Sequence, residues 1–199
     1  MITGFRQDRG QTLPMYVVVV GGLLFLAFAY FAFAQAAVAR NGGQSAADAA
    51  ALAGAQEMRD ELTDGFIDSF DTPDELIDWL DGKGVSGADA GAAAAQLASE
   101  NDSNLLNPYV DTDRLEFTAE IETRYTVGDS VIPGTENVHA KADATAVVEP
   151  RCDITPGSDP AKLIEIDCED SIRWEIDPKD FVVEDLPEPQ DLFSVHLTE

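Results

Sequence analysis

Side chains that perform chemistry are scarce in this chain. Its 199 residues include two cysteines and two histidines, and no P-loop, HExxH, GxSxG or CxxC pattern occurs. The stretch 82–87 matches GxGxxG, but the pattern before it is that of a short helix, whereas a dinucleotide site requires a buried strand there. We therefore expect no catalytic activity, no cofactor and no metal site.

Basic residues are also few. The 12 lysines and arginines stand against 38 aspartates and glutamates, which gives a formal net charge of -26. Such a surface repels phosphate backbones and anionic lipid headgroups, and no basic stripe in the sequence reverses this. We expect no nucleic-acid partner, and the acidity favours solubility outside the cell.

Charge is absent altogether from one long stretch, Met15 to Ala39. Its first twenty residues, through Ala34, also contain no amide side chain. At about 1.5 Å per residue they cross the roughly 30 Å hydrocarbon core of a bilayer, whereas a buried helix is rarely so long and so uniformly apolar. We predict a single transmembrane helix over 15–39, preceded by a short stub over 1–14.

The charges that flank this stretch predict its orientation. The stub carries Arg6 and Arg9 against Asp8, and the chain beyond Arg40 is predominantly acidic. Because lysine and arginine near a span stay on the cytoplasmic side, we expect a single-pass protein of the cell membrane with its amino terminus inside. A signal peptide cleaved after Ala34 is the alternative, although the apolar run exceeds the roughly 7 to 15 residues of a signal h-region.

The two cysteines, Cys152 and Cys168, both lie beyond the predicted span. In an oxidising compartment such a pair most often forms one disulfide, here closing a loop of about 17 residues and contributing about 3 kcal/mol on the chain-entropy estimate. A metal site would need further ligands, which His139 and His196 do not supply at a suitable spacing.

An alanine-rich segment follows the span. Gly42 and Gly43 favour an end to the first helix, since each costs about 1 kcal/mol in a helix interior, but residues 45–62 are strong helix formers. We predict that the helix resumes or runs straight through to about Thr63. Small residues recurring at four- and seven-residue spacing mark a candidate helix-packing face, unless they only reflect the abundance of alanine: Gly22, Ala29, Ala36, Ala46, Ala50 and Gly54.

Two shorter helices are predicted next. Thr72 is the expected N-cap of an amphipathic helix that begins at Pro73 and closes at Gly82. Ser86 is the expected cap of an alanine-rich helix over about 87–99.

From Leu115 the hydrophobic period changes to two. Apolar and polar residues alternate over 115–127 and again over 138–148, which predicts an antiparallel pair of strands whose alanines leave room for a helix. Further short strands are predicted over 163–168, 172–176 and 192–197. The fold class is therefore α+β, with the transmembrane helix continuing into an extracytoplasmic helical region over 40–110 and an antiparallel β-rich region with one disulfide over 111–199.

The amino-terminal quarter carries a recognisable pattern. The segment Asp8-Arg9-Gly10-Gln11 precedes the span, and Gln44-Ser45-Ala46-Ala47-Asp48-Ala49-Ala50-Ala51-Leu52-Ala53-Gly54-Ala55 follows it. Over about residues 8–56 the chain resembles the TadE/TadG-like proteins of tight-adherence (Flp) pilus assembly. The resemblance implies a pilin-like or accessory subunit without catalysis of its own, whose partners are other membrane proteins of the pilus or secretion machinery, with self-association through the amino-terminal helix.

One departure from prepilin-type subunits concerns the start of the span. Those subunits are cut after a glycine and carry glutamate five residues into the mature chain, but a cut between Gly10 and Gln11 places Met15 at that position. The intramembrane carboxylate that docks a major pilin is missing. We therefore favour an uncleaved accessory subunit, with cleavage after Gly10 as the alternative.

Two functions of another class compete with this hypothesis. One is a membrane-tethered acidic binding module whose sheet and helices hold a ligand or calcium. The other is a soluble protein secreted after cleavage at Ala34. The mass of the protein extracted from membranes distinguishes the secreted form from the anchored ones.

Overall fold

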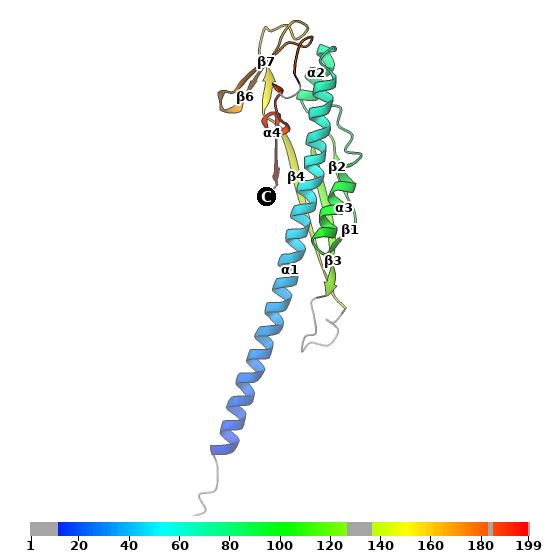
Figure 1. Ribbon diagram of the computed structural model, residues 1–199. Coiled ribbons are helices and arrows are strands. Elements are labelled where there is room, and N and C mark those ends of the chain that lie inside the picture. The colour runs from blue at the N-terminus through cyan, green and yellow to red at the C-terminus, as the bar shows by residue number, and fades with distance from the viewer. Residues whose placement is uncertain (1–11, 127–136, 183–184, 199) are drawn as a thin grey trace, which may run out of the picture.

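One helix dominates the structure, a computed structural model that describes residues 12–126, 137–182 and 185–198. Helix α1 (Thr12–Asp68) runs without interruption through 57 residues, on the order of 85 Å, and its second half forms the spine of a folded domain (Figure 1). The prediction that a helix passes Gly42 and Gly43 is confirmed. It ends at Asp68 rather than near Thr63, because the fully buried Leu62 and Phe66 continue its apolar face.

Gly42 lies where α1 meets the end of a sheet. A Cβ atom on Gly42 would collide with the hydroxyl of Tyr125, whose strand approaches the helix at this point. Glycine permits this close approach, which offsets its low helix propensity.

The helix lies against a five-stranded antiparallel sheet. The strands are β1 (Ser103–Leu105), β2 (Tyr109–Asp111), β3 (Glu116–Thr126), β4 (His139–Pro150) and β8 (Phe193–Leu197). Their order is β1-β3-β4-β8, and β2 also pairs with β3. The predicted pair of long strands is confirmed as β3 and β4, although Val127, the last residue of the first predicted strand, lies outside the described residues.

Small side chains allow α1 to pack closely on this sheet. Five alanines of α1 are fully buried: Ala46, Ala47, Ala50, Ala51 and Ala55. On the strands, Ala119 and Ala146 are fully buried as well, and the ring of Phe117 lies beside Gly54. The expectation that the alanines of the returning strand leave room for a helix is therefore confirmed.

Helices α2 (Pro73–Leu80) and α3 (Ala90–Glu100) follow α1. Helix α2 begins where it is predicted, although the Thr72 hydroxyl bonds the Glu75 carboxylate at 3.0 Å rather than a backbone amide. The prediction that Ser86 caps α3 is wrong. The helix begins at Ala90 with Asp89 as N-cap, because the Ser86 side chain is held by α1.

A second, smaller sheet contains β5 (Cys152–Ile154), β6 (Ile164–Cys168) and β7 (Arg173–Ile176), with the 3-10 turn η1 (Glu169–Ser171) between the last two. The predicted disulfide is confirmed, and it joins Cys152 and Cys168, which oppose each other across β5 and β6. The strands predicted over 163–168, 172–176 and 192–197 are found within one residue of those bounds, as β6, β7 and β8. A one-turn helix, α4 (Pro189–Leu192), directly precedes β8.

Candidate functional site

The first half of α1 is the most distinctive surface of the molecule. From Leu13 to Val38 every large apolar side chain is exposed or only partly covered, and Tyr30 is 78% exposed. The first buried residue along the helix is Ala39, which is 4% exposed. In the described part of the chain, α1 is the one helix long and apolar enough to cross a membrane. A continuous apolar surface of this size is unfavourable in water and is typical of a membrane anchor.

The candidate helix-packing face is divided by the fold. Gly22, Ala29 and Ala36 lie on the uncovered half of α1, and a Cβ atom on Gly22 would meet nothing within 4 Å. By contrast, Ala46, Ala50 and Gly54 are buried within the domain that α1 supports. The structure does not bring the two sets together, and only the first three residues are open to a neighbouring helix.

The candidate processing site falls outside this description, since Gly10 and Gln11 precede the described residues. Met15, which stands where a prepilin-type subunit carries glutamate, is exposed on the uncovered half of α1. The sequence places no charged side chain between it and Arg40. The uncovered half of α1 therefore offers a neighbour dispersion contacts and no ion pair.

A carboxylate on α1 holds the connection between α2 and α3. Glu61 Oε1 accepts hydrogen bonds from the Ser86 backbone at 2.8 Å and from the Ser86 hydroxyl at 2.7 Å, while Oε2 accepts one from the Gly87 backbone at 2.9 Å. Gly87 has a φ of +64°, and a Cβ atom on it would lie 2.9 Å from Val110. Glu61 thus fixes this loop against α1 and sets the start of α3.

We expect the substitution Glu61→Gln to lower the free energy of unfolding by about 1 to 2 kcal/mol, because an amide group replaces one carboxylate oxygen and leaves a loop donor without an acceptor. Chemical denaturation of the full chain in detergent, followed by circular dichroism, measures the change. Glu57→Gln is the matched control: Glu57 lies one turn earlier and makes no hydrogen bond or ion pair among the described residues. Equal stability of the two variants would contradict the role of Glu61.

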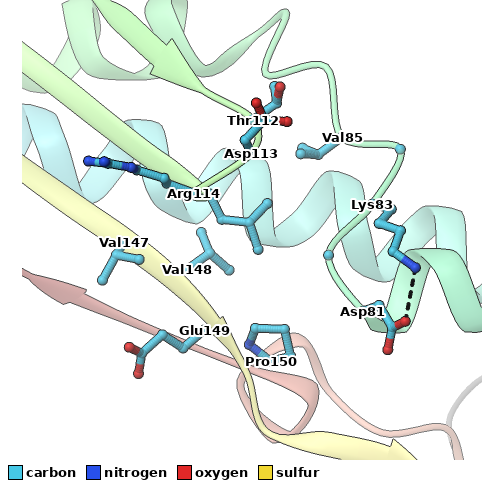
Figure 2. A pocket seen from close by; sticks show the side chains of 13 residues that line it. Asp81, Lys83, Val85, Thr112, Asp113, Arg114, Val147, Val148, Glu149 and Pro150 are labelled. Atoms are coloured by element: carbon cyan, nitrogen blue, oxygen red, sulfur yellow. Dashed lines mark hydrogen bonds and ion pairs between the residues drawn. The ribbon is translucent and has the colours of Figure 1, made fainter.

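A cavity with a volume of about 550 Å³ lies between the loop after α2, the start of β3 and the end of β4 (Figure 2). Its wall is formed by residues 81–85, 112–115 and 147–150. Figure 2 shows that the side chain of Lys83 turns towards Asp81, while the side chains of Arg114 and Glu149 extend away from the cavity. Lys83 Nζ lies 3.0 Å from Asp78 and 3.2 Å from Asp81, and the hydrogen bonds to these two carboxylates raise the pKa of Lys83.

The glycines of this cavity wall have structural roles. Gly82 has a φ of +82° at the exit from α2, and a Cβ atom there would collide with the side chain of Leu115. Gly84 also has a positive φ, of +98°. The GxGxxG match thus follows a helix and forms a turn, so it lacks the strand context of a dinucleotide site. The wall contains no histidine or cysteine, and the described residues contain no cluster that could hold a metal ion.

The part of the chain that resembles known proteins lies almost entirely in α1. Residues 10–57 match a family model described as putative Flp pilus-assembly TadE/G-like. Neither a curated protein nor a solved structure matches the chain. The family match covers about a quarter of the sequence and ends at Glu57, after the first turns of α1 that pack on the sheet. The resemblance predicted from the sequence is thereby confirmed, and the chain is TadE/TadG-like in the segment that carries its membrane helix.

Proposed function

We propose that this chain is a bitopic, non-catalytic accessory subunit of Flp pilus assembly or of the related secretion machinery. The observation that carries the proposal is the change along α1 at Ala39, from an uncovered apolar helix to the buried spine of a domain. The family match spans this change. Because the helix is continuous, a contact made in the bilayer through the face of Gly22, Ala29 and Ala36 is rigidly linked to the domain above it.

The proposed orientation has the stub in the cytoplasm and the acidic domain outside. Arg6 and Arg9 before the span support it, since basic residues stay inside. The disulfide between Cys152 and Cys168 supports it independently, because disulfides persist in oxidising compartments outside the cytoplasm. In this arrangement the membrane boundary lies near Ala39 and Arg40, and the domain comprises the residues beyond it.

Fusing alkaline phosphatase after the carboxyl terminus tests the orientation, because this enzyme becomes active only outside the cytoplasm. We expect high phosphatase activity in cells that carry the fusion. A matched fusion with both stub arginines replaced, Arg6→Glu and Arg9→Glu, should lose most of it, since the positive charges that retain the stub are gone. An inactive fusion of the unaltered chain that remains in the membrane fraction would refute the proposed orientation.

The proposed role in pilus assembly is tested by deleting the gene and counting surface pili. We expect pili to be lost and to be restored by the full chain, but not by residues 35–199 exported behind a cleavable signal. Normal piliation of the deletion strain would refute the proposal.

Secretion of a soluble domain is the second candidate function, and one observation favours it. Residues 13–34 are not buried in the domain, so a cut after Ala34 would leave the buried core intact. The intact mass of the mature protein decides between them. The proposed anchored subunit has the full mass of 21.4 kDa, whereas a cut after Ala34 removes the greater part of the membrane helix.

A further inference from the structure

An apolar groove lies where the uncovered half of α1 meets the folded domain. Its lining residues, which we name the foot, are Phe31, Ala34, Gln35, Val38 and Ala39 of α1 with Tyr125 and Thr126 of β3. The groove has a volume of about 390 Å³. It is built by segments almost a hundred residues apart in the sequence, brought together because β3 descends beside α1 (Figure 1).

The length of the apolar helix places the foot at the level of the lipid headgroups. The twenty residues from Met15 to Ala34 cross the hydrocarbon core of about 30 Å. The whole apolar run from Leu13 to Ala39 spans about 40 Å, which equals the bilayer with its interfacial layers. No length of helix is left over to lift the domain clear of the membrane, so Tyr125, beside residues 31–39, lies in the interfacial layer.

The side chains of the foot suit this layer. Tyr125 is 38% exposed, with its ring at the groove and its hydroxyl at Gly42, and tyrosine is enriched at membrane interfaces because its ring is apolar and its hydroxyl polar. Val138, directly before β4 at the same end of the sheet, is 46% exposed. The side-chain oxygen of Gln35 is buried and has no hydrogen-bond partner in the described structure.

Arg40 adds a positive charge beside the foot. Arg40 is exposed and follows the last residue of the foot on α1. It makes no ion pair with any described residue, in a chain with 38 acidic side chains. The next basic side chains above it have partners, since Lys141 lies 3.6 Å from Glu122 and Arg124 bonds Asn104 at 2.9 Å. Arg40 is thus available to the phosphate of a lipid.

We propose that the foot is a lipid-binding surface that seats the domain directly on the bilayer. A phospholipid of the adjoining leaflet lies with an acyl chain in the groove and its phosphate at Arg40. The groove opens along a helix face that already contacts lipid, so the occupant is continuous with the bilayer. The proposal rests on the membrane anchoring in the proposed function and adds to it a fixed height for the domain.

The test places a fluorescent reporter in the full chain, either in the foot at Tyr125 or directly before β4 at Val138. Tyr125→Trp and Val138→Trp are made separately and reconstituted, one copy per disc, into phosphatidylcholine nanodiscs with bromine atoms on the acyl chains near the headgroup. The emission of the native Trp79 and Trp174 is subtracted with the unaltered chain. We expect the brominated lipid to remove roughly half of the added emission at either position, because tryptophan in the interfacial layer contacts these chains. Tyr109→Trp, on the exposed strand β2, is the control and should be unaffected.

The outcomes are distinguishable. Loss of emission at 125 or 138, with none at 109, supports the lipid-binding foot. Absence of quenching at both positions in a chain that remains in the disc overturns it and leaves the anchoring intact. Quenching that disappears when a disc holds two copies shows that a second α1 fills the groove, which also overturns it. Failure of the chain to enter discs or membranes overturns the anchoring itself.

Discussion

Replacing Phe117 with alanine is expected to lower the free energy of unfolding of the domain by about 3 to 5 kcal/mol. The ring is fully buried in the interface between β3 and α1. Its neighbours include Gly54 on α1 and Ala146, its partner on β4, and these have no side-chain length with which to fill the space. The measurement is chemical denaturation of the full chain in detergent, followed by circular dichroism.

The effect of Gly54→Ala on stability should change sign when Phe117 is replaced, and this change is the control for Phe117→Ala. In the unaltered chain, a Cβ atom on Gly54 would lie 2.5 Å from the Phe117 ring, so Gly54→Ala is expected to cost about 1 to 3 kcal/mol. Once Phe117 is alanine the collision is gone, and Gly54→Ala should instead stabilise the helix by up to about 1 kcal/mol. Stabilisation of the unaltered chain by Gly54→Ala would contradict the close packing of α1 on β3.

The elements with long periodic patterns are predictable from the sequence. Helix α1 follows from an apolar run and an alanine-rich run, and β3 and β4 follow from strict alternation with a buried face. The three-residue strands β1, β2 and β5 have no such pattern, and they form because a neighbouring strand supplies their hydrogen bonds. Short strands of this kind depend on tertiary pairing rather than on local propensity.

The candidate sites were also only partly predictable from the sequence. Small residues at four-residue spacing indicate a close packing partner, but the same pattern serves packing on a helix or on a sheet. Ala46, Ala50 and Gly54 are buried within the domain of their own chain, and Gly54 meets Phe117 of β3, which the spacing alone does not reveal. The start of α3 depends on Glu61, 25 residues before Ser86, and the foot depends on the meeting of β3 with α1. Contacts at such separations leave no periodic signal.

Removing the disulfide is expected to have the second largest effect. Cys152 and Cys168 are 16 residues apart, so replacing both with serine should lower the free energy of unfolding by about 3 kcal/mol. The main cause is that the unfolded chain gains conformational entropy when the bridge no longer closes this loop. The fully buried Ile164 and Ile166 on β6 belong to the core, so loosening this sheet destabilises the domain as a whole. Denaturation with and without a thiol reductant measures the effect.

Reduction distinguishes the effect of losing the disulfide from the effect of replacing the cysteine side chains. The unaltered chain treated with reductant should become about as stable as the double serine variant, and the variant itself should not respond, because all the expected stabilisation resides in the covalent link. A variant as stable as the oxidised chain would mean that the hydrogen bonds between β5 and β6 restrict this segment without the bridge. A bridge without effect on stability gives the domain no need for an oxidising compartment, and the proposed orientation would then rest on Arg6 and Arg9 alone.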